Sequence, residues 1–177
     1  MTEDTNSGSV LNKNDIYSLI DATPPLITNH TDLESQVQPH GFDLTLKTLH
    51  TFKSSGQVDF TNHERIISDT KTLQFNTNGY IHLEPKSYLI TFNEEIRMPL
   101  DLMALAMPRS TLLRCGVSVH TAVWDAGYQG RSEALMTVYN NEGFRVKQGA
   151  RLIQLVFIKL TSPLAKGYDG IFFQENL

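Results

Sequence analysis

The chain has 177 residues, of which 40% are hydrophobic and 19% are charged, as in a globular protein with one sizeable core. Its formal net charge of -4 argues against a general nucleic-acid binder, because such proteins carry a basic face. The single cysteine, Cys115, excludes an internal disulfide and indicates a reducing compartment. We find no signal-peptide pattern and no stretch near the roughly 20 apolar residues of a spanning helix. We therefore expect a cytoplasmic protein with neither a nucleic-acid nor a membrane partner.

The N-terminal part of the chain predicts a tail and one short helix. Residues 1–8 are polar, and we expect a disordered tail there, followed by a single domain over 9–177. Apolar residues then recur at helical spacing, which predicts a short helix over about 14–21. Either Asn12 or Asn14 can cap this helix.

From Phe42 onward, apolar and polar residues alternate with the period of a β-strand. Many short segments of this kind, separated by turns, predict an all-β sandwich or barrel. Further strands are expected over 65–67, 80–83, 88–92, 102–107, 117–123, 134–139 and 152–160, with turns at 54–56, 76–79, 93–95 and 140–143. One internal helix is predicted over 110–114, because it follows Pro108 and ends just before Gly116.

The start of this internal helix is a candidate anion site. If a strand ends at Met107, the free backbone N–H groups at the helix start can bind an anion. The hydroxyls of Ser110 and Thr111 and the charges of Arg109 and Arg114 can add charge-assisted hydrogen bonds to phosphate oxygens. The alternative interpretation is an ordinary helix cap beside two solvated arginines.

Residues 121–130, TAVWDAGYQG, carry a lone carboxylate between apolar neighbours, and their two glycines predict the tip of a β-hairpin. The main chain of such a tip can bind a base edge. Asp125 can act as a general base on a water, and Tyr128 can stack on a deoxyribose. The alternative is a turn aspartate that bonds its own backbone, with Trp124 and Tyr128 packed in the core.

Two shorter patterns are less specific. Residues 149–154, GARLIQ, lead into a predicted strand that carries Gln154. Asp43 lies on a strand whose alternate positions are apolar, and a carboxylate in that setting needs a partner. The alternatives are a plain strand with an outward arginine and glutamine, and an aspartate exposed to solvent.

Together these segments resemble the family of homotrimeric dUTP diphosphatases and dCTP deaminases. PRSTLLR (108–114) is similar to the family's PRSSLAR, GARLIQ to GxRxxQ, and GFDL (41–44) to G(Y/F)DL. TAVWDAGYQG is similar to both the diphosphatase pattern GVIDxxYxG and the deaminase pattern TAxxIDPGFxG, and YDGIFFQ (168–174) is similar to the deaminase ending YxGxYQG. The resemblance covers about residues 9–176. It implies a distorted jelly-roll (the dUTPase-like β-clip), a homotrimer with shared active sites, and a C-terminal arm over about 165–177.

The resemblance also implies an activity, which is the hydrolysis of dUTP to dUMP and pyrophosphate. In this reaction Asp125 would activate a water that attacks the α-phosphate, with Mg²⁺ as the cofactor. Asp43 would lie near the metal-bound triphosphate and contact it through water. The implied substrate-binding residues are Arg109, Ser110, Thr111, Arg114, Thr121, Ala122, Val123, Tyr128, Gln154, Tyr168 and Phe172.

Two alternatives remain open. Deaminases of this family use a glutamate three residues before an asparagine, and Thr137 stands there if Asn140 is that asparagine. Glu133 lies four residues before Thr137 and would face the same side of a regular strand, so a dCTP deaminase or a bifunctional enzyme is possible through Glu133. A non-catalytic nucleotide-binding regulator is the second alternative, although the presence of Asp125 argues against it. One cysteine is too few for a zinc deaminase.

Overall fold

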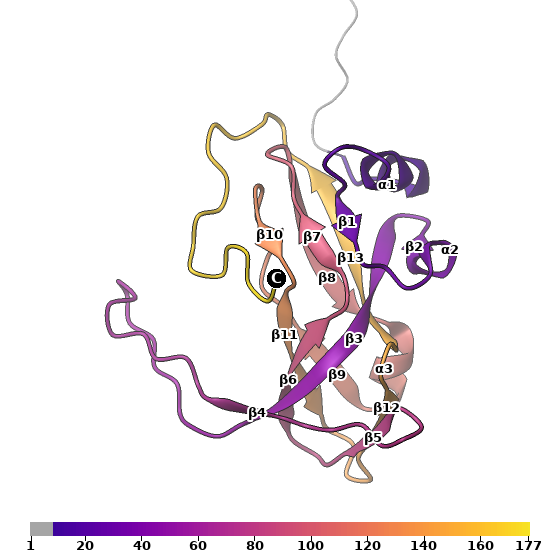
Figure 1. Ribbon diagram of the computed structural model, residues 1–177, viewed down its shortest axis with the longest axis vertical. Coiled ribbons are helices and arrows are strands. Elements are labelled where there is room, and N and C mark those ends of the chain that lie inside the picture. The colour runs from indigo at the N-terminus through magenta and orange to yellow at the C-terminus, as the bar shows by residue number, and fades with distance from the viewer. Residues whose placement is uncertain (1–8) are drawn as a thin grey trace, which may run out of the picture.

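A computed structural model describes residues 9–177 of the chain (Figure 1). The tail predicted over 1–8 lies outside the described residues. The fold is mostly β, as the alternating pattern predicts. The helices are α1 (Lys13–Ile20), α2 (Leu33–Gln36) and α3 (Ser110–Arg114). The strands are β1 (Ile27–Thr28), β2 (Val37–Gln38), β3 (Gly41–Phe52), β4 (Thr70–Thr72), β5 (Tyr80–Leu83), β6 (Ser87–Phe92), β7 (Glu95–Arg97), β8 (Leu102–Pro108), β9 (Val117–His120), β10 (Gln129–Gly130), β11 (Glu133–Val138), β12 (Phe144–Lys147) and β13 (Arg151–Lys159).

The strands form three sheets. The largest has the order β8-β13-β3-β6-β11-β9, and β2 and β4 also pair with β3. A second sheet has the order β1-β7-β10, and β12 pairs with β5 in the third. Strand β3 runs diagonally across the molecule in Figure 1, because its first half pairs with β13 and its second half pairs with β6 and β4. A register shift between Leu46 and Thr48, in the pairing with β6, lies between these two halves.

Burial explains why the local signals at the N-terminal end form a helix. Ile16 and Ile20 point from α1 into the core, while the opposite face is exposed. Asn12 is the cap: its side chain accepts hydrogen bonds from the backbone N–H groups of Asn14 and Asp15, at 2.8 and 3.3 Å. The Asp15 carboxylate accepts the Asn12 N–H at 3.0 Å, which completes a capping box. The predicted helix and its cap are therefore confirmed, with Asn12 rather than Asn14 in the capping position.

Two predictions about local structure are wrong. No strand forms over 65–67, because these residues lie in a long excursion between β3 and β4, where Ile66 makes only an isolated bridge to Gln57. Residues 121–130 are not a hairpin tip either. Strand β9 pairs with β11 in the large sheet, whereas β10 pairs with β7 in the second sheet. The segment between β9 and β10 therefore turns a corner between two sheets.

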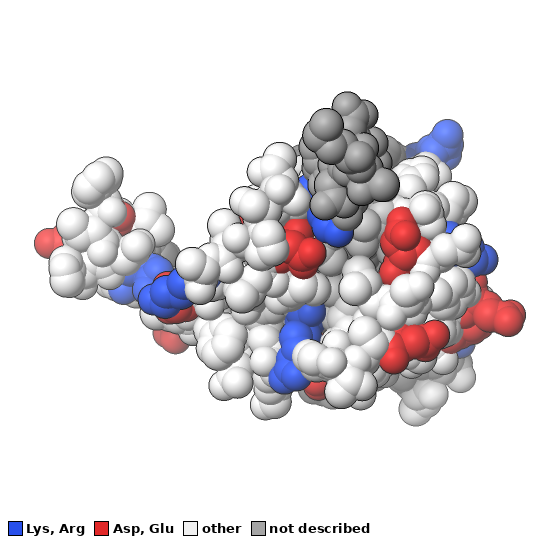
Figure 2. All heavy atoms as spheres, turned by 90° about the horizontal axis from the view of Figure 1, so that it is seen from above, with Lys and Arg blue, Asp and Glu red and all other residues white. Residues whose placement is uncertain are grey.

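The surface and the helices bear on possible partners. In Figure 2, lysine and arginine side chains are scattered among acidic and uncharged residues on the face shown. Within residues 9–177, no helix is long and apolar enough to cross a membrane.

Candidate active site

A cavity of about 300 Å³ lies between the corner segment 121–128, the start of β11 and the C-terminal segment. Seven of the predicted site residues line it: Ala122, Val123, Asp125, Tyr128, Glu133, Tyr168 and Phe172. Trp124, Ser132 and Glu175 also line it, and we did not predict a site role for them. The volume is at the lower end of the range for small-molecule sites.

Asp125 lines this cavity and is held by a tight turn. The backbone N–H of Tyr128 donates to the Asp125 carbonyl at 3.0 Å, and Gly127 supplies the positive φ of +82° that this turn needs. A side chain at Gly127 would also collide with Gly167, whose Cα would lie 2.6 Å from the added carbon. The C-terminal segment therefore packs directly on the turn, and Tyr168 N–H donates to the Ala126 carbonyl at 2.9 Å. The Asp125 residue itself is exposed and can meet a water.

Two aromatic residues form the buried wall of the cavity. The indole N–H of Trp124 donates to the Ser132 hydroxyl at 2.8 Å. The hydroxyl of Tyr128 donates to the Glu175 carboxylate at 2.7 Å, and its ring meets the Tyr168 ring edge-on at 5.9 Å. Burial, reinforced by the Glu175 carboxylate, raises the pKa of Tyr128. Tyr128 is thus a neutral donor whose position is fixed on two sides.

Glu133, and not Thr137, reaches the cavity. Strand β11 pairs with β6 in unbroken register from Glu133 to Thr137, so the two residues lie about 13 Å apart along a strand. Glu133 lines the cavity at the start of the strand. The Thr137 hydroxyl is hydrogen-bonded to Ser87 at 3.0 Å instead. Glu133 and Thr137 are therefore four residues apart on one regular strand, and it is the Glu133 carboxyl that shares a cavity with Asp125.

The predicted phosphate-binding residues form a second group around the start of α3. Arg109 is the N-cap residue of α3 and has no side-chain hydrogen bond to the helix, and Ser110 and Thr111 are exposed in its first turn. The Arg114 side chain donates to the Ser110 carbonyl at 2.9 Å. Exposed hydroxyls and N–H groups beside two arginines are suited to an anion.

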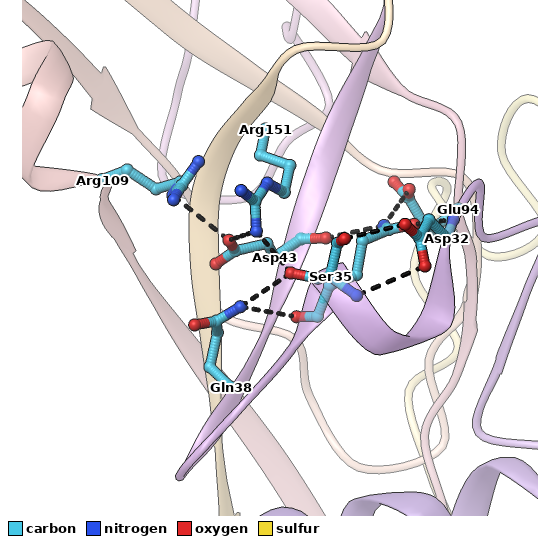
Figure 3. Close-up of polar contacts among 8 residues, drawn as sticks. Asp32, Ser35, Gln38, Asp43, Glu94, Arg109 and Arg151 are labelled. Atoms are coloured by element: carbon cyan, nitrogen blue, oxygen red, sulfur yellow. Dashed lines mark hydrogen bonds and ion pairs between the residues drawn. The ribbon is translucent and has the colours of Figure 1, made fainter.

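Asp43 organises this second group (Figure 3). Its carboxylate is 1% exposed and meets the guanidinium groups of Arg109 at 3.2 Å and Arg151 at 3.4 Å. Burial raises the pKa of Asp43, and the two arginines oppose that shift. Arg151 also donates to the Ser35 carbonyl. Gln154 is the register partner of Asp43 on β13. Arg109 and Arg151 therefore share one buried carboxylate, and the exposed Asp32 carboxylate also acts on Arg151.

A second buried carboxylate lies close by. Glu94 is fully buried and accepts hydrogen bonds from the Thr45 N–H at 2.9 Å, the Thr45 hydroxyl at 2.6 Å and the Gln36 side-chain amide at 2.7 Å. Burial raises the pKa of Glu94. Its contacts join β3 to the loop before β7 and to α2, so this residue is structural.

Glu94 predicts a pH-dependent stability. Because its pKa in the folded protein lies above the ordinary value of 4.5, the folded state binds more protons just above that pH. The free energy of unfolding should therefore fall as the pH rises through this window. Glu94→Gln cannot titrate, so the stability of the wild type relative to this variant should decline by up to about 1.4 kcal/mol per pH unit. Urea unfolding at several pH values from 4.5 upward measures this difference, with the exposed Glu142→Gln as control. Parallel curves for wild type and Glu94→Gln would contradict it.

The two groups of residues are separated within one chain. Trp124, on the cavity wall, forms an isolated bridge with Ala104 on β8. Arg109 follows five residues later, and five residues of strand span about 17 Å. Arg109, Ser110, Thr111, Arg114, Thr121, Gln154 and Asp43 do not line the cavity.

The surroundings of Asp43 bear on its predicted contact with a metal. The described part of the chain holds no group of three or more His, Cys, Asp or Glu residues arranged for a metal ion. Asp43 is engaged by two arginines, which compete with a cation for its oxygens. Its role as a metal ligand through water stays a prediction.

Comparison with known proteins identifies the family. The family model described as dCTP deaminase-like matches residues 10–160. The chain belongs to this family. The chain is 51% identical over 168 residues to a curated relative, the "Probable deoxyuridine 5'-triphosphate nucleotidohydrolase" of Methanosarcina barkeri. The matched region covers 95% of this chain and 98% of that protein. The chain is 34% identical over 142 residues to the "Deoxyuridine 5'-triphosphate nucleotidohydrolase" of Methanocaldococcus jannaschii, covering 78% and 88%.

A solved structure gives the same fold. The 2'-deoxycytidine 5'-triphosphate deaminase from Agrobacterium tumefaciens superimposes with a TM-score of 0.64 at 21% identity. The match covers 86% of this chain and 49% of that structure, so the chain spans about half of its length. The resemblance inferred from the sequence motifs is therefore confirmed at the level of family and fold.

Proposed function

We propose that this chain hydrolyses dUTP to dUMP and pyrophosphate. The observation that carries the proposal is the exposed carboxylate of Asp125 at a cavity walled by Tyr128. Relatives at 51% and 34% identity that are named probable deoxyuridine 5'-triphosphate nucleotidohydrolase and deoxyuridine 5'-triphosphate nucleotidohydrolase support it. The direct test is pyrophosphate release from dUTP by the purified protein. If dUTP raises the melting temperature but is not cleaved, the chain is instead a nucleotide-binding regulator.

In the proposed reaction Asp125 takes a proton from a water as its oxygen attacks the α-phosphorus. The bond from the α-phosphorus to the bridging oxygen breaks, and pyrophosphate leaves. The start of α3, with Arg109, Ser110, Thr111 and Arg114, would bind the phosphate oxygens. Gln154 would lie near the phosphates or the base. The main chain of Thr121, Ala122 and Val123 would bind the base.

Mg²⁺ is proposed as the metal that accompanies the triphosphate. When bound, it would spread the negative charge of the phosphate oxygens. Since the described side chains offer few ligands, the phosphate oxygens and water would supply most of its coordination. The protein's own contribution would be the two arginines beside Asp43, Arg109 and Arg151.

The separation of the two groups supports a homotrimer with shared sites. The cavity of one subunit and the α3 group of another would together bind one nucleotide. The Asp43 cluster would then lie at a subunit boundary.

We expect a trimer in solution at all concentrations that support activity. Each half-site alone lacks either the base Asp125 or the phosphate donors, so a monomer cannot hold the whole substrate. Sedimentation velocity combined with activity on the same fractions measures this. A stable monomer with full activity would refute the shared-site proposal.

The Tyr128 ring should exclude ribonucleotides. Placed against the sugar, it would crowd a 2′-hydroxyl. Tyr128→Ala should therefore raise kcat/KM for UTP relative to dUTP by roughly tenfold or more, the size of one substrate contact. Steady-state kinetics with both nucleotides measure the ratio. An unchanged ratio would remove Tyr128 from sugar recognition.

Deamination of dCTP is a second candidate, favoured by one observation. Glu133 lines the same cavity as Asp125, where a pyrimidine would be bound. A carboxyl there can shuttle protons to the ring. The names of the relatives support dUTP hydrolysis, which is why we rank deamination second.

A further inference from the structure

The C-terminal segment is attached to the site by its main chain. Gln174 N–H donates to the Gln129 carbonyl at 2.7 Å, and Arg131 N–H donates to the Glu175 carbonyl at 2.9 Å. Gly130 and Glu175 form a parallel bridge, so residues 174–176 extend the sheet edge at β10. In Figure 1 the yellow end of the chain returns to this edge. These contacts involve backbone atoms, and they fix the segment whatever side chain stands at position 175.

The Glu175 side chain contacts Tyr128 inside the cavity. It is half-buried, lines the cavity and accepts a hydrogen bond from the Tyr128 hydroxyl at an oxygen–oxygen distance of 2.7 Å. The pair occupies space that Gly130 leaves free. A side-chain carbon on Gly130 would lie 2.8 Å from the Tyr128 hydroxyl oxygen and 3.2 Å from Cγ of Glu175. The absence of a side chain at Gly130 therefore leaves room for the hydrogen bond between Tyr128 and Glu175.

The hydrogen bond fixes the Tyr128 ring where the ring borders the cavity. The phenol has one O–H, which it donates to the Glu175 carboxylate, so in this arrangement the hydroxyl is not a donor for substrate. The other side of the ring meets Tyr168, from the same C-terminal segment. Glu133, the neighbouring carboxylate, accepts a hydrogen bond from the Asn176 side chain at 3.4 Å, whereas the phenol donates to Glu175. Glu175 thus accepts the hydroxyl's hydrogen bond and anchors the ring, while the Ser132 side chain also lies within hydrogen-bonding reach of the Tyr128 hydroxyl.

We propose that Glu175 is a positioning residue that sets the selectivity for 2′-deoxyribose by holding the Tyr128 ring in place. This deepens the proposed function and rests on it. A ring that is anchored cannot withdraw from an added 2′-hydroxyl, and a ribonucleotide is rejected. A ring without its anchor can tilt and admit the hydroxyl. In this proposal Glu175 acts through its hydrogen bond to Tyr128.

The test compares kcat/KM for dUTP and UTP in Glu175→Ala, Glu175→Gln and Tyr128→Phe. Loss of a hydrogen bond to a charged group should lower the dUTP:UTP ratio about tenfold in Glu175→Ala. Glu175→Gln keeps an acceptor and should retain most of the ratio. Tyr128→Phe keeps the ring and should match Glu175→Ala, and the double variant should lose nothing further, because both changes break the same bond. A general loss of structure would lower both rates together and would not be rescued by glutamine.

The controls separate this inference from the proposed function. Asp169→Asn lies on the same segment, pairs only with the exposed Lys166, and should leave the ratio unchanged. If the wild type releases no pyrophosphate from dUTP, the proposed function fails, and the inference fails with it. If the wild type is active and selective but both Glu175→Ala and Tyr128→Phe keep its ratio, the inference alone is overturned. If Glu175→Ala does not fold, Tyr128→Phe alone decides: a lowered dUTP:UTP ratio supports the inference, and an unchanged ratio overturns it.

Discussion

Asp125→Asn should lower kcat for dUTP hydrolysis by about 10²–10⁴-fold, the usual contribution of a general base, while the Kd for dUTP stays nearly unchanged. Asparagine keeps the size and the turn geometry of aspartate, because the turn depends on the residue 125 carbonyl and not on its side chain. The amide cannot accept the proton of the attacking water. The chemical step is therefore lost while nucleotide binding is kept.

Single-turnover kinetics and titration calorimetry on the same protein measure the two quantities. Asp169→Asn is the matched control, since it makes the same chemical change at an exposed position of the nearby C-terminal segment. An unchanged kcat would remove Asp125 from the mechanism. A loss of dUTP binding equal to the loss of kcat would assign Asp125 to substrate binding rather than to proton transfer.

The sequence was sufficient to predict those helices and strands whose formation depends on residues close to them along the chain. The helix α1 follows from its capping box and its two buried isoleucines, and α3 follows from the residues between Pro108 and Gly116. The alternation of residues after Phe42 reflects a strand, although both faces of the first half of β3 are buried. These features depend on short-range hydrogen bonds and on side-chain period.

Long-range pairing could not be predicted in the same way. The glycines of 121–130 are typical of a hairpin, but the partner of β10 is β7, some thirty residues away in sequence. Ile66 and Ile67 have strand propensity yet lie exposed in the excursion, where the pairing is limited to one isolated bridge between Ile66 and Gln57. Strand propensity becomes a strand only where a partner is present.

The site was predictable in part for a related reason. Asp125 and Tyr128 lie in one motif, so spacing alone brings them together. Glu175 gave no such signal, because it is 47 residues from the tyrosine that it contacts. Motif alignment placed Thr137 by its distance from Asn140 and Glu133 by its distance from Thr137. In the structure the register of β11 fixes the position of Glu133, and Glu133 lines the cavity.

Because Glu133 lines the cavity, a comparison of dUTP and dCTP as substrates is the decisive test of the proposed chemistry. With Mg²⁺ present, dUTP should yield dUMP and pyrophosphate, and dCTP should yield little or no ammonia. Thr137, which stands in the deaminase acid's place, cannot transfer protons and is bonded to Ser87. Without a correctly placed acid, we expect ammonia release from dCTP to be at least about 10²-fold slower than pyrophosphate release from dUTP, since a general acid contributes about that much. Parallel assays of both nucleotides for both products measure this.

Glu133→Gln separates the possible outcomes, with the exposed turn variant Glu142→Gln as its control. If dCTP releases ammonia and Glu133→Gln abolishes that release while dUTP cleavage continues, the enzyme is bifunctional and Glu133 is its proton shuttle. Ammonia that persists in Glu133→Gln would mean that another group serves the ring and that neither position has been matched correctly to the deaminase motif. If dCTP yields no ammonia and Glu133→Gln leaves dUTP cleavage intact, Glu133 is a cavity-lining residue that Asn176 holds in place. Asp125 would then be the one carboxylate of the cavity that takes part in the chemistry.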